Sequence, residues 1–127
     1  MSNKIRAHQY LDAIQFSERM ADPALWMRCA KELLSSARIL EREVEQYWAE
    51  VNVEGTRVVS APSRPSPQGP YSMLVAYALE NIFKALLIHR NAASLRNRLL
   101  TRIPAYLKEH DLVQLAKRAG VTLDVSE

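Results

Sequence analysis

The feature that most constrains this fold is a long apolar stretch, residues 71–88, which carries a charged pair in its middle. Hydrophobic side chains occupy most of its positions, so the sequence predicts a helix that is buried nearly all round. Glu80 and Lys84 interrupt it at the spacing at which side chains meet on a helix. Buried charges are costly unless they are paired and hydrogen-bonded. The pair therefore predicts further polar partners elsewhere in the fold.

The length of the chain, 127 residues with 48% hydrophobic content, predicts one domain spanning residues 1–127. Charged residues interrupt the first twenty positions, so no leader for export is expected and the predicted location is the cytoplasm. Residues 71–88 approach the length that crosses a bilayer. Glu80 and Lys84 would be costly at a bilayer centre. We therefore expect a core helix and no membrane partner.

Apolar periodicity predicts an all-α fold. A weak first helix covers about residues 4–20, and a second helix of nearly thirty residues begins at Asp22-Pro23, a capping side chain followed by proline at the first helical position. Its predicted inward stripe includes Cys29, which we expect in the core. The stripe comprises Leu25, Cys29, Leu33, Ala37, Leu40, Val44, Tyr47 and Val51.

Prolines and glycines interrupt the pattern from Asn52 to Pro70, which predicts a long flexible loop between the second and third helices. Residues 56–61 could form a short extended piece, but they have no evident partner strand, so no sheet is expected. After the central helix, residues 91–103 predict a short helix or turn that ends before Pro104.

The last predicted helix begins at His110 or Asp111 and ends at Gly120, where glycine permits the left-handed backbone of a helix end. Beyond it, Asp124 and Ser126 are residues that begin helices, yet the sequence stops there. We expect either a short tail or a longer protein in which a further helix follows.

The polar residues of the last helix offer partners for the buried pair. We predict a polar cluster of Glu80, Lys84, His110 and Asp111 between the central and last helices. One interpretation is a structural cluster that ties the two helices together. The other is a ligand or catalytic cluster at a helix interface.

Charge is distributed unevenly along the chain. No Asp or Glu occurs between Lys84 and Lys108, whereas residues 32–54 are mostly acidic. Such asymmetry is typical of a nucleic-acid surface or of a complementary self-association surface, and a solvated helix connection would also produce it. The predicted basic surface comprises Arg90, Arg96, Arg98, Arg102 and Lys108.

The run from Ala78 to Leu87, with Glu80 and Lys84 inside it, followed by His110-Asp111-Leu112 and a Gly120 end, resembles the HEPN family of prokaryotic helical-bundle domains. The resemblance covers most of residues 23–121. It implies an up-and-down bundle of about four to five helices with a long Pro-rich loop between the second and third. It also implies a frequently homodimeric protein in toxin–antitoxin, phage-defence or RNA-processing settings.

Active members of that family are metal-independent ribonucleases in which an arginine precedes a histidine by four to six residues. Here Arg102 precedes His110 by seven intervening residues, and Pro104 lies between them. The three histidines lack metal-ligand spacing and no cysteine cluster accompanies them, so no metal or cofactor is expected.

Three functional hypotheses follow. The first is a HEPN-like module that acts by self-association as a homodimer, with RNA or a partner protein as its target. The second is an endoribonuclease in which His110 serves as acid or base and Arg102 or Lys84 stabilises the developing charge. The third is a small-ligand site between helices. Catalysis needs these groups in an open cleft, whereas a structural cluster needs them buried and mutually satisfied.

Overall fold

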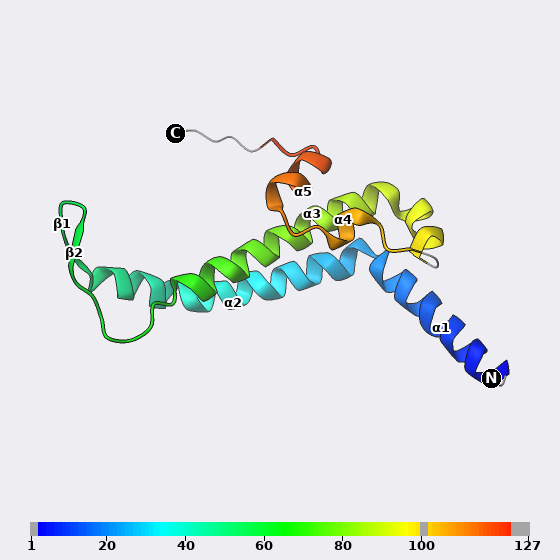
Figure 1. Ribbon diagram of the computed structural model, residues 1–127, viewed down its shortest axis with the longest axis horizontal. Coiled ribbons are helices and arrows are strands. Elements are labelled where there is room, and N and C mark those ends of the chain that lie inside the picture. The colour runs from blue at the N-terminus through cyan, green and yellow to red at the C-terminus, as the bar shows by residue number, and fades with distance from the viewer. Residues whose placement is uncertain (1–2, 100–101, 123–127) are drawn as a thin grey trace.

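The computed structural model describes residues 3–99 and 102–122. A long antiparallel pair of helices, α2 (Pro23–Ala49) and α3 (Gln68–Leu99), forms the spine of an elongated molecule (Figure 1). At one end of the spine, α1 (Asn3–Met20) projects away from the pair. The predicted extents of the first two helices are confirmed.

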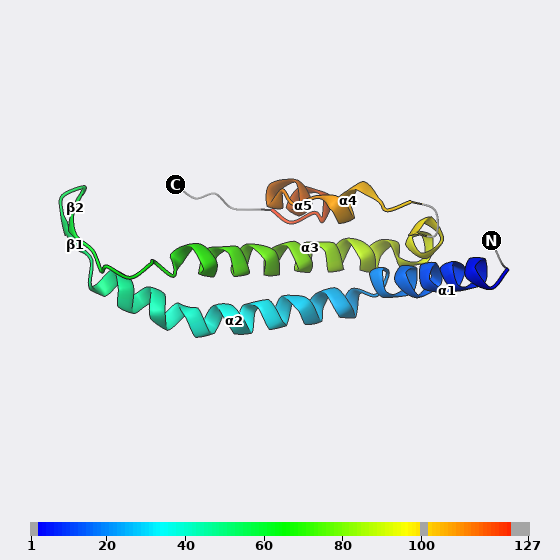
Figure 2. The same ribbon diagram turned by 60° about the horizontal axis from the view of Figure 1, so that its bottom comes forward.

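Two short helices, α4 (Ala105–Lys108) and α5 (Leu112–Arg118), lie on the side of α3 opposite α2, so that α3 is the middle layer (Figure 2). The chain is thus mostly helical, as its periodicity predicts. Asp124 and Ser126, on which the prediction of a further helix depends, lie outside the described residues.

The start of α2 follows its sequence signal. The side chain of Asp22 accepts a hydrogen bond from the backbone N–H of Ala24 at 3.0 Å, and Pro23 occupies the first helical position. The indole N–H of Trp26 donates to the backbone oxygen of Met20 at 3.0 Å. The turn between α1 and α2 is therefore fixed from both sides.

Small side chains allow α2 and α3 to pack along their length. Ala30 and Ala37 are buried on α2, and Ala78 and Ala85 are buried on α3. In each helix the two alanines are seven residues apart, so they lie on one face two turns from each other. Alanines at these positions let two helix backbones approach closely.

α3 is longer than the predicted central helix and bends at Asn91, whose φ of −120° and ψ of 16° are not helical. The Asn91 side-chain amide donates to the backbone oxygen of Leu87 at 2.8 Å. The predicted change of structure at residue 91 is therefore a kink, and helix continues beyond it to Leu99.

The prediction of a loop without a sheet is wrong for residues 52–60. β1 (Asn52–Glu54) and β2 (Arg57–Ser60) form an antiparallel pair that projects from the far end of the spine (Figure 1). Gly55 turns the chain with a φ of +62°. The partner strand, β1, is only three residues long and lies just after the end of α2. So short a strand has too little sequence pattern to be predicted.

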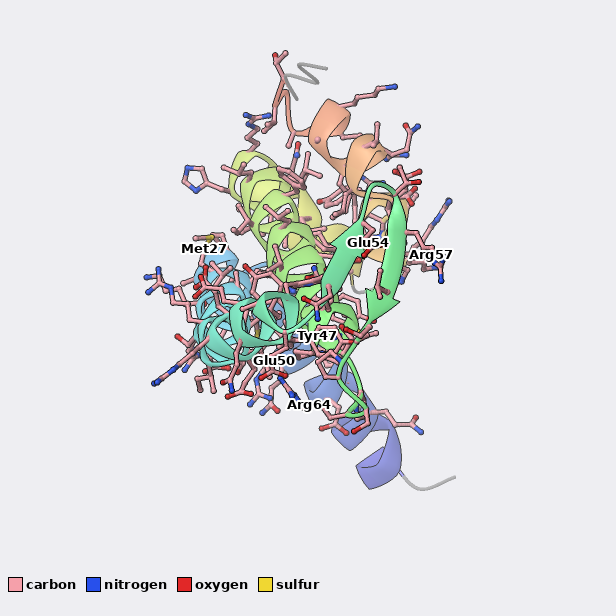
Figure 3. All side chains as sticks on the ribbon, turned by 90° about the vertical axis from the view of Figure 1, so that its left-hand side faces the viewer. Met27, Tyr47, Glu50, Glu54, Arg57 and Arg64 are labelled. Carbon is pink, nitrogen blue, oxygen red and sulfur yellow. The ribbon has the colours of Figure 1, made fainter. Side chains whose placement is uncertain are left out.

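The remainder of the predicted loop, residues 61–67, has no regular structure and is held against the end of α2. Arg64 donates to the carboxylate of Glu50 at 2.6 Å and lies 5.7 Å from the ring centroid of Tyr47 (Figure 3). The hydrogen bond from Arg64 lowers the pKa of Glu50, and the same bond raises the pKa of Arg64.

Two apolar clusters form the core, both around the second half of α3. One joins the end of α1 to α3 and α4, and the other joins α3 to α5. The first consists of Ala21, Ile88, Leu95, Leu99 and Leu107. The second consists of Phe83, Leu87, Leu115, Ala116 and Ala119. The residues of α3 before Phe83 lie outside both clusters.

Two burial predictions are wrong. The central helix is not buried all round, since Leu79 and Leu86 are 39% and 37% exposed. The described helices pack mainly on two sides of α3 and leave other sides free. Cys29 is exposed rather than in the core, because α2 turns Ala30 and Ala37 toward the interior instead.

Residues 68–95 of α3 are long and apolar enough to cross a membrane by length and composition alone, with a mean hydropathy of 1.3. Of the most apolar stretch, 39% is buried inside the fold. A core helix meets the same criterion, so this feature is weak evidence for a membrane span.

Candidate functional site

The predicted charged pair lies near the middle of α3. The ammonium of Lys84 is 3.1 Å from the carboxylate of Glu80, and the two residues are only 3% and 8% exposed. Lys84 also donates to the backbone oxygen of Leu107 in α4 at 2.9 Å. The pair therefore connects α3 to the short helical segment above it.

A third partner of Lys84 comes from α2. Its ammonium lies 5.7 Å from the ring centroid of Trp26, within the range of a cation–π contact. Among the described residues, no buried polar side-chain atom lacks a hydrogen-bond partner. The buried lysine is thus satisfied by groups from three elements, as a structural cluster requires.

His110, between α4 and α5, reaches the pair from the surface. Its Nδ1 hydrogen-bonds with the same Glu80 oxygen that binds Lys84, while its side chain remains 79% exposed. The predicted contact of Glu80, Lys84 and His110 is therefore present. Glu80 fixes the orientation of the imidazole, and most of the ring stays in contact with solvent.

Asp111, the fourth predicted member of the cluster, caps a helix and has no hydrogen bond or ion pair with Glu80 or Lys84 among the described residues. Its carboxylate accepts hydrogen bonds from the backbone N–H groups of Val113 and Gln114, at 2.9 and 3.2 Å, and so caps α5. One oxygen of Glu109 accepts from the backbone N–H groups of His110 and Asp111. Glu109 is not among the predicted site residues, although an acid just before a helix cap is a usable signal for such a turn.

Arg90, predicted as part of the basic surface, caps the other end of α5. Its guanidinium donates to the backbone oxygen of Ala119 at 2.6 Å. Gly120 has a φ of +72°, and Gly120 and Val121 donate their N–H groups to Lys117 and Ala116. This is a Schellman motif, the helix end that the glycine predicts.

The other basic residues do not converge on His110. Arg98, Arg102 and Lys108 are exposed near the kinked end of α3 and in α4, and the side chain of Arg96 lies outside the described set. Burial raises the pKa of Tyr106, and the positive charge of Arg98 acts in the opposite direction. Within the described residues, Arg102 and His110 share neither a hydrogen bond nor an ion pair.

The described residues contain no group of three His, Cys, Asp or Glu side chains close enough to hold a metal ion. A pocket of about 210 Å³ lies where α1, α2 and α3 meet, open to solvent and almost wholly apolar. Its lining residues are Arg19, Met20, Leu25, Trp26, Cys29 and Asn81. It lacks the converging polar groups that orient a small ligand.

A row of apolar side chains runs along one side of α3. Val75, Leu79, Ile82 and Leu86 recur at intervals of four and three, so they lie on one helix face. Leu79 and Leu86 are exposed and the other two are half-buried. This is the spacing of a helix that packs against another helix.

The flank of α2 on the same side carries two apolar side chains among exposed charged ones. Trp26 lies under Lys84, so the Glu80–Lys84 cluster occupies one side of the α2–α3 layer. Met27 projects from the opposite flank, away from α5 and from the β1–β2 arm (Figure 3). Leu34 is seven residues further along the same flank. We call this set the open face: Met27 and Leu34 of α2, with Val75, Leu79, Ile82 and Leu86 of α3.

Comparisons by family model, by sequence and by structure find no match between this chain and known proteins.

Proposed function

We propose that this chain is a HEPN-like helical module that acts by self-association, as a homodimer in the cytoplasm, and that binds RNA or a partner protein in a toxin–antitoxin or defence system. The open face is the observation that supports it most directly. A helix row with two leucines more than a third exposed is unusual for a helix with so apolar a sequence.

The composition of the open face fits association with another helical surface. Its residues are aliphatic or Met, and on the same flank of α2 the exposed Lys31 lies between Met27 and Leu34. Burying a fully exposed leucine side chain contributes about 1.5–3 kcal/mol, and Leu79 and Leu86 can contribute a part of this because they are 39% and 37% exposed. Burial of these residues on both subunits would favour association, against the entropy that the two molecules lose when they join.

Sedimentation velocity tests the self-association. We expect the wild-type chain to sediment as a dimer at micromolar concentration and the Leu79→Asp/Leu86→Asp variant as a monomer, because the carboxylates would be buried without partners. Ile39→Asp is the matched control, since Ile39 is a more exposed apolar residue of α2 whose helical position points away from α3. Monomeric wild-type protein at every concentration would refute the proposal.

Endoribonuclease activity is the second candidate, and one observation favours it. Glu80 holds Nδ1 of His110 while the ring stays largely exposed, which is the arrangement of a carboxylate that orients a general base. Lys84 is too deeply buried to contact a phosphate, and Arg102 does not join the imidazole.

Metal-free incubation with mixed RNA tests this second function. Cleavage by the wild-type chain that is lost in His110→Ala would establish catalysis and displace the binding proposal. If neither chain cleaves RNA, the histidine serves the structural cluster. The His89→Ala variant is the control, since His89 is an exposed histidine of α3 outside the cluster.

A further inference from the structure

The apolar pocket where α1, α2 and α3 meet has a size that suits one small molecule. Its volume is about 210 Å³. In another protein, an engineered apolar cavity of about 150 Å³ binds benzene. The pocket of this chain therefore has room for an aromatic ring that carries a short side chain.

The walls of the pocket favour an aromatic ring. They include an indole and two sulfur-containing side chains, from Trp26, Met20 and Cys29. Ring–ring and sulfur–ring contacts are both favourable at short range. The indole is already held in place, because its N–H donates to the backbone oxygen of Met20 at 3.0 Å and the ammonium of Lys84 lies 5.7 Å from its ring centroid. A ligand would thus meet a surface that needs little ordering.

The mouth of the pocket carries one cation. The lining is almost wholly apolar although it includes Arg19, so the aliphatic stem of this exposed residue lies on the wall and its guanidinium extends toward water. Among the residues that the structure describes, Arg19 forms no ion pair and no side-chain hydrogen bond. A guanidinium beside an apolar pocket is complementary to a carboxylate attached to an apolar body.

The remaining polar side chain of the lining is bonded within its own helix. The side-chain amide of Asn81 donates to the backbone oxygen of Tyr77 at 2.8 Å. Without several converging polar groups, the pocket would not hold a sugar or a nucleotide in one orientation. The ligand that fits it has an apolar body and a single anionic end.

We propose that this pocket binds a small aromatic carboxylic acid, with the ring against Trp26 and the carboxylate paired with Arg19. The bound acid contacts the last turn of α1, the start of α2 and the middle of α3, and so holds α1 to the spine. The pocket shares no residue with the open face, so binding of the acid does not depend on self-association.

Two residues of the lining can report on whether the pocket is occupied. Cys29 is the one cysteine of the chain and is exposed, so its reaction with a thiol reagent is specific to this place. In the Trp48→Phe variant, Trp26 is the one remaining tryptophan. We expect 3-phenylpropionate to slow the reaction of Cys29 and to change the fluorescence of Trp26, with a single dissociation constant below about 1 mM.

The contribution of the charge is tested with a neutral analogue, 3-phenylpropan-1-ol, which should bind at least about tenfold more weakly than the acid. Arg19→Gln should raise the dissociation constant of the acid about tenfold and leave that of the alcohol unchanged. Arg42→Gln is the matched control, because Arg42 is an exposed arginine of α2 outside the pocket. Equal binding of acid and alcohol to the wild-type chain would refute the proposal.

The contribution of the ring is tested with hexanoate, which carries the same charge without an aromatic group. It should bind at least about threefold more weakly than 3-phenylpropionate. Equal binding of the two acids would refute the aromatic class of the ligand.

The place of binding is tested by filling the pocket. Cys29→Phe puts a ring into it from an exposed position, whereas Cys29→Ala leaves it open. In the Trp48→Phe background, the first substitution should abolish binding of 3-phenylpropionate and the second should preserve it, and circular dichroism checks that both variants fold. Undiminished binding to the Cys29→Phe variant would refute the proposed site. A wild-type chain that binds no 3-phenylpropionate up to about 10 mM would refute the proposal as a whole.

Discussion

Lys84 is 3% exposed and remains compatible with folding because its ammonium reaches three groups. A carboxylate, a backbone oxygen and an aromatic face surround it, from α3, α4 and α2 respectively. Buried charges of this kind contribute little net stability compared with apolar residues of equal volume, but removing one partner is costly. The two effects can be measured separately by mutation.

Lys84→Met should lower the free energy of unfolding by up to about 3–5 kcal/mol, because Glu80 would remain buried with the His110 imidazole as its remaining side-chain partner. The double variant Lys84→Met/Glu80→Leu should be more stable than Lys84→Met alone, since it also removes the buried carboxylate of Glu80. Urea unfolding followed by circular dichroism measures both values. Additive losses from the two substitutions would contradict the proposed coupling.

Tyr106 gives a prediction for alkaline pH. Burial raises its pKa in the folded state above the ordinary value of 10.0, so above pH 10 the unfolded chain loses this proton more readily than the folded one. The stability contributed by the neutral phenol is present below pH 10 and is lost as the pH rises through the raised pKa. Tyr106→Phe should therefore lose less stability than the wild-type chain between pH 9 and 11 in thermal melts. Equal losses would argue against a raised pKa.

At the level of secondary structure, α5 is a seven-residue helix whose two ends are both fixed by specific contacts. Asp111 caps its start, and the Schellman turn with Arg90 closes its end. A helix this short is not stable in isolation, so caps and packing against α3 must hold it in place.

Gly120→Ala tests the end of α5. The left-handed φ of +72° should cost an alanine about 1–2 kcal/mol of folding free energy. An added Cβ would lie 3.7 Å from the Arg90 guanidinium, an ordinary contact, so steric clash adds nothing. Gly69→Ala, in the first turn of α3 with open space around it, is the control and should be neutral or stabilising in chemical unfolding. Equal effects at both sites would contradict this explanation.

The sequence predicts elements well where the signal is local. The predicted helix ends are present at Asp22-Pro23, Asp111 and Gly120. They could be predicted because capping involves only a few neighbouring residues. The β arm was missed because a three-residue strand has too little pattern to recognise. The exposure of Leu79 was missed because apolar composition alone does not reveal which faces of a helix find a partner.

The same distinction applies to the candidate site. The contact of Glu80, Lys84 and His110 was predicted from residue types that need one another. The hydrogen bonds from Lys84 and Arg90 to the backbone oxygens of Leu107 and Ala119 were not predicted. Any residue supplies a backbone oxygen, and only the tertiary arrangement selects one. The arginine–histidine pair was not found because Arg102 and His110 belong to separate segments around Pro104.

For the whole molecule, the elongated spine determines how much surface remains available. The two core clusters lie along α3 only from Phe83 onward, so α2 and the part of α3 before Phe83 support each other mainly through a single interface. A layer one helix thick has two broad sides, and here one side carries the polar cluster while the other is the open face. The stability of such a layer depends on what covers the open face.

Thermal unfolding should therefore depend on protein concentration. If the folded dimer is the stable species, raising the concentration a hundredfold should raise the midpoint temperature of the wild-type chain by several degrees, because dissociation accompanies unfolding. The midpoint of Leu79→Asp/Leu86→Asp should be lower and independent of concentration. Differential scanning calorimetry measures both, and a wild-type midpoint that does not move with concentration would contradict the model of a coupled dimer.

The hydrogen bond from Lys84 to the backbone oxygen of Leu107 limits where α4 and α5 can pack along α3. Leucines of α4 and α5 could meet the apolar side of α3 at several heights along its axis. A slip of one helical turn, about 5.4 Å, would separate the ammonium from the Leu107 oxygen and the carboxylate from the imidazole of His110. We infer that the Glu80–Lys84 pair fixes the position of α4 and α5 along α3, because other positions would leave buried charges with fewer partners. The pair then makes the fold more specific and adds little to its stability.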